Sequence, residues 1–366
     1  MTLPLCSAIN NSIFLDTDGA VKTCCAGQSV LGNIGDETLP IIFSKEEYLD
    51  IKSALEKQTF PSYCSRCEEH EKIGPHMSQY DYFKNNIPGT EDNQLIHIDL
   101  RWSNVCNLSC RYCEPRASSQ WQKLLNIPIV SVDKDYHKTI FDHIEKNVGT
   151  IKHASLLGGE PLMQKQNEQL LSTINPSTHI EIITNLSVPL GNNKIYNLLK
   201  NHRDITWCVS FENVGDRFEY VRNGASWDLL KENLNIVKEE FGVENIMFLA
   251  VYGLWNATRL EEFLGFANQF GARLGLQPVI SNTGLSVFDH GPEIKEMALR
   301  EIDNISKYNY YGFSDIKNRL LNTQEVPNIA NTFIKWTQSS EQLMNPKKNF
   351  AELWPEINQV LSKHLP

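Results

Sequence analysis

The chain has 366 residues, of which 41% are hydrophobic and 21% charged, a composition typical of a globular protein with about two domains. Its formal net charge is −10 and it has no block of basic residues, which argues against nucleic acid as a partner. No apolar run reaches the roughly 18 residues that span a bilayer, and no secretory signal opens the chain, so we expect a cytoplasmic protein without a membrane partner.

Residues 1–80 are expected to form a first unit that opens with a β-hairpin. Strand-like runs at 13–15 and 20–23 flank Asp16–Gly19. Asp-Gly between two such runs is a strong hairpin signal, because glycine accepts a positive φ. The hairpin would place Cys24 at the end of its second strand.

A helix is predicted over residues 44–58, directly before a pair of cysteines. Ser44 would be the N-cap and Glu47 would complete a capping box. After the helix, Cys64 and Cys67 form a C-x2-C pair.

Residues 81–93 are polar and are predicted to be a linker, and the region 94–285 then alternates short apolar runs with longer amphipathic ones. The predicted strands are 95–102, 153–157, 179–184, 205–211, 245–252 and 273–279. The predicted helices between them include 136–147, 193–201, 226–240 and 258–270. Repeated strand–helix units imply an α/β fold with parallel strands.

Residues 286–366 carry no motif that can be assigned. Residues 293–306 and 350–363 are predicted to be helices, so this segment would be a helical C-terminal extension. Two roles stay open for it: packing against the preceding domain, or covering a substrate so that solvent is excluded.

Nine cysteines are the most informative residues of the chain, and eight of them lie before residue 114. In a cytoplasmic protein such clustering indicates metal or redox chemistry, because structural disulfides are rare there. The ninth, Cys208, lies in an apolar run and is expected to be buried rather than to bind a metal.

Three of these cysteines follow the first strand of the α/β region with the spacing C-x3-C-x2-C: Cys106, Cys110 and Cys113. A loop this tight can direct three thiolates to one point. Cysteine thiolates hold iron–sulfur clusters, and a four-iron cluster normally takes four of them, so three would leave one iron open. A zinc knuckle or three unrelated thiols are the alternatives, although zinc sites favour C-x2-C pairs.

This spacing, with Tyr112 directly before the third cysteine, resembles the radical S-adenosylmethionine (SAM) superfamily. The resemblance implies a [4Fe–4S] cluster whose open iron chelates SAM. Reductive cleavage of SAM to a 5′-deoxyadenosyl radical would then lead to hydrogen abstraction from a substrate C–H. It also implies a partial (β/α)6 barrel over 94–285, with the chemistry at the C-terminal ends of the strands.

Further segments at the ends of predicted strands resemble the SAM-binding motifs of this superfamily. Gly158, Gly159 and Glu160 match the GGEP motif, which implies that they hold the SAM amino group. Asn185 follows the third strand and would be a polar neighbour of SAM. Relatives often have a glycine at the next position, where this chain has Leu186.

Two more SAM contacts are implied at and after the fourth strand. Ser210 would bond the ribose or the carboxylate of SAM, with Glu212 where relatives usually have Asp. Arg222 lies in a stretch that resembles the family's R-x-G segment, and its guanidinium suits a bidentate pair with the SAM carboxylate. No catalytic acid or base is predicted.

The first unit resembles the auxiliary-cluster domain called SPASM, or twitch in its shortened form. The resemblance lies in C-x12-G-x4-C followed by C-x2-C, formed by Cys6, Gly19, Cys24 and the later pair of cysteines. It implies that four residues hold one auxiliary [4Fe–4S] cluster: Cys6, Cys24, Cys64 and Cys67. Cys25 competes with Cys24, and a structural zinc site with four thiolates is the alternative. In most relatives this domain follows the barrel, whereas here it precedes it.

Relatives with such domains modify ribosomally made peptides or dehydrogenate small alcohols. We therefore expect a peptide-modifying enzyme that cross-links, epimerises or oxidises its substrate. The alternatives are a small-molecule dehydrogenase of natural-product biosynthesis and a non-catalytic iron–sulfur or zinc scaffold. The expected partners are a peptide or small-molecule substrate and an electron donor such as flavodoxin or ferredoxin.

Overall fold

The computed structural model describes residues 3–73, 78–87, 89–90, 94–128, 134–279, 283–308, 310 and 312–363. The chain divides into two compact units, and each is described by itself. The first consists of Met1–Cys106, Pro128–Thr184 and Leu190–Thr206, and the second of Asn107–Ile127, Asn185–Pro189 and Trp207–Pro366. Within the described part of the chain, no helix is both long enough and apolar enough to cross a membrane.

The first unit is built on a sheet whose strands are β1 (Ser12–Leu15), β2 (Ala20–Lys22), β3 (Gly32–Asn33), β4 (His97–Leu100), β6 (His153–Leu156) and β7 (His179–Thr184). They follow the order β7-β6-β4-β1-β2-β3, and β4, β6 and β7 are parallel, as predicted for this region. The predicted N-terminal hairpin is confirmed, with Phe14 opposite Lys22 in the antiparallel pair β1–β2. Gly19 has φ +84° in its turn.

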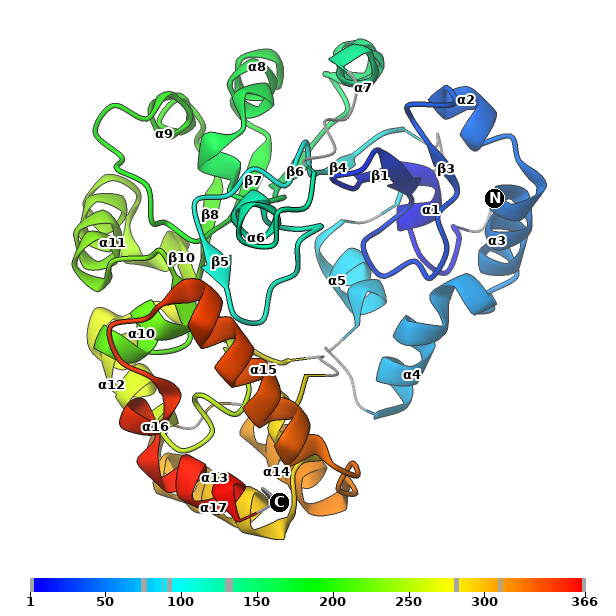
Figure 1. Cartoon of the computed structure of the whole chain (residues 1–366). Coiled ribbons are helices and arrows are strands. Elements are labelled where there is room, and N and C mark those ends of the chain that lie inside the picture. The colour runs from blue at the N-terminus through cyan, green and yellow to red at the C-terminus, as the bar shows by residue number, and fades with distance from the viewer. Residues whose placement is uncertain are drawn as a thin grey trace. The chain divides into compact units, whose positions relative to one another are not determined.

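The N-terminal hairpin continues the sheet of the α/β region. β1 pairs in parallel with β4, in a register that runs from Ser12 opposite His97 to Leu15 opposite Leu100. β1 and β4, which lie side by side in Figure 1, have buried side chains, so this seam belongs to the core of the unit. The sequence contained no sign of this pairing, because parallel partners can be far apart along the chain.

The helices of the first unit are α1 (Ala8–Asn11), α2 (Leu39–Ile42), α3 (Glu46–Glu56), α4 (Ser65–Ile73), α5 (Gln79–Asn86), α7 (Lys134–Asn147), α8 (Lys165–Thr173) and α9 (Lys194–Leu199). The predicted helix over 44–58 is present as α3, but the predicted capping box is wrong. Lys45 is its N-cap, without a side-chain bond. Ser44 Oγ instead donates to the carbonyl oxygen of Ile41 at 2.8 Å, and Glu47 accepts from Ser29 Oγ at 2.6 Å.

Helix α5 occupies part of the segment that was predicted to be a linker. Ser78 is its N-cap, and the Ser78 hydroxyl accepts a bond from the Asp81 N–H at 3.0 Å. Phe83 is buried in a cluster with Ala8 and Ile96, and this burial explains why the segment is helical rather than extended. Residues 88 and 91–93 of the predicted linker lie outside the described residues.

The second unit contains the other strands, β5 (Ser109–Cys110), the end of β8 (Ile205–Ser210), β9 (Arg222–Asn223), β10 (Ile246–Tyr252) and β11 (Arg273–Pro278). β10 lies between β8 and β11 and is parallel to both. With β4, β6 and β7 of the first unit, all six strands predicted for the α/β region are therefore present. β5 and β9 form a separate antiparallel pair that was not predicted.

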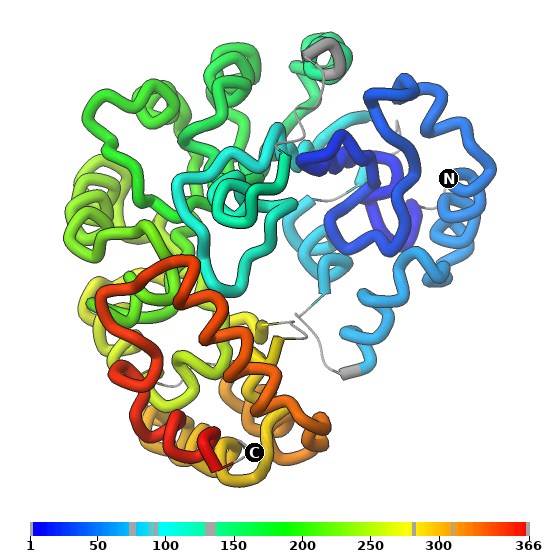
Figure 2. Tube along the Cα trace, in the orientation of Figure 1, coloured from blue at the N-terminus to red at the C-terminus, as the bar shows by residue number. Residues whose placement is uncertain are grey.

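The helices of the second unit are α6 (Ser119–Leu124), α10 (Gly215–Val221), α11 (Trp227–Phe241), α12 (Leu260–Phe270), α13 (Pro292–Asn304), α14 (Phe313–Asn322), α15 (Ile329–Met344), α16 (Phe350–Leu353) and α17 (Pro355–Ser362). The C-terminal extension is helical, as predicted, and α17 packs against α13 and α15 (Figure 2). The predicted helix over 350–363 is divided at Pro355, which starts α17 because proline lacks the N–H that would continue α16.

Candidate functional site

The cysteine loop of the second unit is held by backbone pairing. In the β5–β9 pair, Cys110 lies directly opposite Arg222. The indole N–H of Trp121 donates to the carbonyl oxygen of Cys110 at 2.8 Å, and the Ser118 hydroxyl donates to that of Leu108 at 2.6 Å. The loop therefore has a fixed course around its central cysteine.

The other two motif cysteines lie at either end of this loop. Cys106 is buried and is the last residue of the first unit before the loop. Cys113 is half-buried, and its N–H donates to the carbonyl oxygen of Cys110 at 2.9 Å. Burial raises the pKa of the Cys113 thiol, so metal binding at this residue has to displace a proton.

The residue after the central cysteine connects the loop to the C-terminal extension. Arg111 is buried, its guanidinium lies 3.8 Å from the centre of the Tyr220 ring, and its Nε donates to the Tyr220 carbonyl oxygen at 2.9 Å. Its Nη1 also donates to the Ser340 hydroxyl on α15. Part of the extension thus packs behind the cysteine loop, in agreement with the packing role that the sequence left open.

Arg222, the predicted partner of the SAM carboxylate, forms a buried ion pair. Its Nε lies 3.1 Å from Glu212 Oε1 and its Nη2 lies 2.8 Å from Glu212 Oε2. The Tyr112 hydroxyl donates to the same Oε2 at 3.3 Å. The sequence drew attention to Glu212 only as a departure from the usual Asp, and its bond to Arg222 was missed. Whether Arg222 also contacts SAM stays a prediction.

Asn185 lies beside the first residue after Cys106. Its side-chain nitrogen donates to Asn107 Oδ1 at 2.9 Å, and Asn107 Nδ2 donates to the Ser187 carbonyl oxygen at 2.9 Å. Leu186, between these residues, is buried with φ +50°, a left-handed conformation that suits the glycine found in relatives. The same backbone turn is therefore kept here with a leucine.

In the first unit, the Gly158–Gly159–Glu160 segment lies against the backbone that leads into Cys106. The Gly159 N–H donates to the Ser103 carbonyl oxygen at 3.0 Å, and the Glu160 N–H donates to that of Val105 at 2.8 Å. A Cβ on Gly159 would lie 2.2 Å from the Val105 oxygen, so only glycine fits there. Gly158 has φ +112°, which also requires glycine.

Glu160 is fully buried, and its carboxylate is oriented by neighbouring donors. Its Oε1 accepts bonds from the Thr184 hydroxyl at 2.6 Å and from the Leu162 N–H at 3.1 Å. The second bond caps the 3-10 turn Pro161–Met163.

In the second unit, Ser210 is the last residue of β8 and is half-buried opposite Leu249 of β10.

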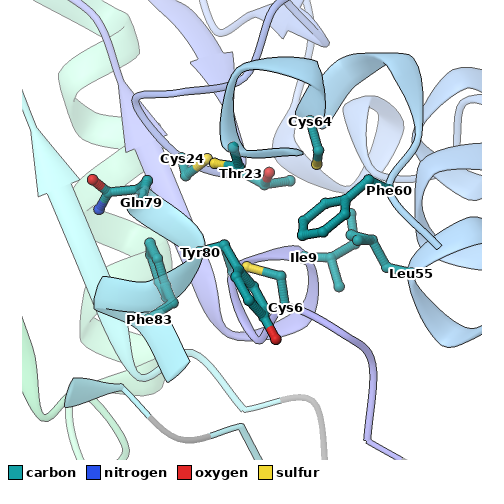
Figure 3. Close-up of a pocket in the computed structure, with 12 residues that line it drawn as sticks. Cys6, Ile9, Thr23, Cys24, Leu55, Phe60, Cys64, Gln79, Tyr80 and Phe83 are labelled. Atoms are coloured by element: carbon teal, nitrogen blue, oxygen red, sulfur yellow. The ribbon is translucent and has the colours of Figure 1, made fainter. Parts of the chain in front are cut away.

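The four cysteines expected to bind the auxiliary cluster line one cavity that is open in part to solvent. In Figure 3, Cys6, Cys24 and Cys64 lie around the same open space, beside the rings of Phe60 and Tyr80. The full lining is Cys6, Ala8, Ile9, Thr23, Cys24, Leu55, Phe60, Cys64, Cys67, Gln79, Tyr80 and Phe83. The four cysteines that the resemblance to SPASM implied as ligands therefore line the same cavity.

Cys25 is exposed and does not line this cavity, which favours Cys24 as the ligand. Burial raises the pKa of the Cys6 thiol to about 11 and that of Cys64 to about 12. Burial also raises the pKa of Cys24 and Cys67, and neighbouring thiols raise that of Cys24 further. Without a metal these thiols are protonated at neutral pH, so cluster binding would release protons.

The donors present fit iron–sulfur clusters. All nine cysteines lie among the described residues and none forms a disulfide, and thiolates are the usual ligands of such clusters. Four thiols around one cavity supply the ligands of one fully coordinated cluster. Among the described residues, no three His, Cys, Asp or Glu side chains are arranged to hold a single metal ion. The four cysteines of the cavity lining are the feature that matches a cluster. Gly159 and the buried Glu160 lie beside the segment that leads to Cys106.

Comparisons with known proteins agree with these features. The sequence model of the radical SAM superfamily matches residues 100–267, and that of the SPASM iron–sulfur cluster-binding domain matches residues 6–68. A curated relative, 7-carboxy-7-deazaguanine synthase from Clostridium acetobutylicum, is 32% identical over 109 residues. That match covers 29% of this chain and 44% of the relative, so the chain spans less than half the length of that protein.

Solved structures that match part of this chain include native anSMEcpe with bound AdoMet and the Kp18Cys peptide. It has 14% identity and a TM-score of 0.45, and the match covers 61% of this chain and 62% of that one. Streptococcus suis SuiB bound to the precursor peptide SuiA has 16% identity and a TM-score of 0.42, with 74% and 61% coverage. The parallel pairing of β4, β6 and β7 and the two family matches confirm the predicted fold class: an α/β domain with parallel strands, preceded by a small iron–sulfur domain.

Proposed function

The chain belongs to the radical SAM superfamily and carries a SPASM iron–sulfur domain ahead of its catalytic domain, and from this premise we propose that it oxidises or cross-links a peptide substrate. SAM and [4Fe–4S] clusters are its cofactors. When bound, they supply reductive SAM cleavage and hydrogen abstraction, and the protein positions the substrate and excludes solvent.

One observation carries this proposal: the cysteines divide into a set of three on one loop and a set of four around one cavity. Three thiolates leave one iron of a cluster open to SAM, whereas four saturate a cluster. A scaffold protein would not need an open set. A second, saturated cluster suits an enzyme whose substrate loses an electron after hydrogen abstraction.

For SAM binding we propose the glycines at 158 and 159, Glu160, Asn185 and Ser210, with Tyr112 beside the cluster. Glu160 is suited to the SAM ammonium because its carboxylate is buried and already oriented by Thr184. Burial strengthens a pair with a cation, because the local dielectric is low. An external one-electron donor, such as flavodoxin or ferredoxin, would supply the reducing electron.

We propose that the auxiliary cluster accepts the substrate electron rather than binding the substrate. With Cys6, Cys24, Cys64 and Cys67 all coordinated, substrate cannot reach an iron unless a thiolate leaves. The expected product is therefore oxidised by two electrons relative to the substrate. One electron leaves with the abstracted hydrogen atom and the second passes to the cluster, with loss of a proton.

Metal content tests this proposal first. Anaerobically reconstituted protein should hold about eight iron atoms, and the triple variant with Cys106, Cys110 and Cys113 replaced by alanine should hold about four. Wild type, but not the triple variant, should form 5′-deoxyadenosine from SAM and dithionite. A triple variant that holds stoichiometric zinc and no iron would refute the auxiliary cluster.

Substrate class is tested by the stimulation of 5′-deoxyadenosine formation. A library of short peptides should increase the rate and yield a product two mass units lighter, as expected for oxidation. Small alcohols serve as the comparison. Stimulation and oxidation by alcohols alone would favour the dehydrogenase alternative and contradict the peptide assignment.

A further inference from the structure

Arg222 lies next to a predicted cluster ligand through both its backbone and its side chain. The antiparallel pair β5–β9 places its Cα opposite that of Cys110. Its Nη1 lies 4.0 Å from Cys110 Sγ, within reach of a hydrogen bond to sulfur. Both residues are buried, so solvent screens this contact little.

Glu212 determines which edge of the guanidinium faces the sulfur. It binds Nε and Nη2 of Arg222 in a fork, and this leaves Nη1 toward Cys110. The side chains of Arg222 and Glu212 are 3% and 0% exposed. The Tyr112 hydroxyl also bonds Glu212, and the Tyr112 ring lies 5.4 Å from the guanidinium carbon. These contacts hold the Arg222 guanidinium near the sulfur, with the Glu212 carboxylate on the other edge of the guanidinium.

Stability alone is a weak explanation for this ion pair. Burying two charges costs several kcal/mol of desolvation, and apolar side chains of similar volume often serve a fold equally well. Although burial lowers the pKa of Arg222, the charge of Glu212 raises it overall, so the guanidinium stays protonated. A permanent positive charge is therefore held beside a cysteine that would become a thiolate ligand.

We propose that the Arg222–Glu212 pair sets the reduction potential of the cluster bound by Cys110, with Arg222 as a positioning residue rather than a catalytic one. Reduction adds one electron, and hence one negative charge, to the cluster. A cation and a hydrogen-bond donor at a ligand sulfur stabilise the reduced form and raise the potential. The electron comes from the external donor, and no proton has to move because Arg222 is already charged. This inference rests on the proposed assignment of Cys110 as a ligand.

Two charge-removing variants separate this role from a merely structural one. In Arg222→Gln the charge of Glu212 stays unpaired, so the potential should fall. In Glu212→Gln the charge of Arg222 is no longer compensated, so the potential should rise. Loosened packing alone would not shift the potential in opposite directions. The readout is an EPR-monitored redox titration of the reconstituted protein, with the auxiliary cluster of the same sample as internal reference.

The matched control is Arg217→Gln. Arg217 also pairs with a glutamate, Glu262, at 2.8 Å, but at the surface, and it precedes Arg222 by five residues. Its loss should leave both potentials unchanged. If a single variant fails to bind iron, the double variant Arg222→Gln/Glu212→Gln buries no unpaired charge. Its potential should lie below that of wild type, because the nearer charge, the cation, has been removed.

The inference is overturned if the two single variants shift the potential in the same direction or leave it unchanged, or if the double variant matches wild type. Weakened SAM binding with an unchanged potential would also overturn it, and would return Arg222 to the predicted SAM carboxylate contact. Failure of the proposed function has a different signature. In that case the cysteine loop binds no iron, and no cluster signal changes when SAM is added.

Discussion

Gly159→Ala should disrupt the contact between the glycine segment and the backbone that leads to Cys106. The added Cβ would lie 2.2 Å from the Val105 carbonyl oxygen and 2.6 Å from the carbonyl group of Asn104. These neighbours are backbone atoms and cannot rotate away, so one segment has to move. Such movement breaks the bond from the Gly159 N–H to Ser103 and the bond from the next N–H to Val105.

The size of the effect follows from these contacts. Two backbone hydrogen bonds contribute about 1 kcal/mol each, and relief of an overpacked contact typically costs about 1–3 kcal/mol. A single backbone shift both breaks the two hydrogen bonds and relieves the overpacked contact, so the two costs overlap. The free energy of unfolding should therefore fall by about 2–3 kcal/mol. Gly149→Ala is the matched control, because a Cβ there meets no atom within 4 Å. It should be neutral or stabilise slightly by restricting the unfolded chain.

Urea unfolding of the two variants, followed by tryptophan fluorescence, measures this difference. Hydrogen exchange at the amide of residue 160 should also be faster in Gly159→Ala, because that N–H loses its acceptor. A free energy of unfolding within about 0.5 kcal/mol of the Gly149→Ala value would show that the segment tolerates a side chain. The close approach of the Gly158–Gly159–Glu160 segment to the backbone that leads to Cys106 would then be incorrect.

Two other predictions concern the first unit. Cys24→Ser should remove the iron of the auxiliary cluster, whereas Cys25→Ser should retain it, because only Cys24 lines the cavity; loss of iron in both variants would count against this assignment. Burial lowers the pKa of His97 from 6.5 to about 3, so below pH 6.5 the unfolded chain binds a proton that the folded protein excludes. The stability contributed by neutral His97 is therefore complete above pH 6.5 and is lost as the pH falls. Between pH 7.5 and 5.5, wild type should lose about 1 kcal/mol more than His97→Gln in urea unfolding, and equal losses would refute this reasoning.

Local patterns in the sequence predicted the parts of the fold that depend on local chemistry. Asp-Gly between two short apolar runs predicted the hairpin, and alternating apolar segments predicted all six strands of the α/β region within a few residues. The resemblance of the cysteine pattern to SPASM pointed to four thiols that line one cavity. The signal for α15 was present but was not used, since Ala330, Phe333, Ile334 and Thr337 have helical spacing and are buried.

One interaction that was missed joins distant segments of the chain. The β5–β9 pair joins residues more than a hundred positions apart, and no periodicity reports such a partner. The fork from Glu212 to Arg222 spans only ten residues, but it was not predicted either, because the two side chains meet only through the fold of α10, which lies between them. The capping box failed because Ser44 is used by the preceding turn. A local rule is correct only when no neighbouring element competes for the same side chain.

The pairing of β1 with β4 locates the auxiliary cavity relative to Cys106 within the first unit. The cavity is lined by α1, which precedes β1, and by α5, which precedes β4. Because β1 and β4 are parallel, both helices enter the sheet from the end where these strands begin. Cys106 follows the other end of β4, beyond four strand residues that span about 13 Å. These strand residues keep the auxiliary cavity and Cys106 at opposite ends of β4, so Cys106 cannot join the four cysteines of the cavity in one cluster.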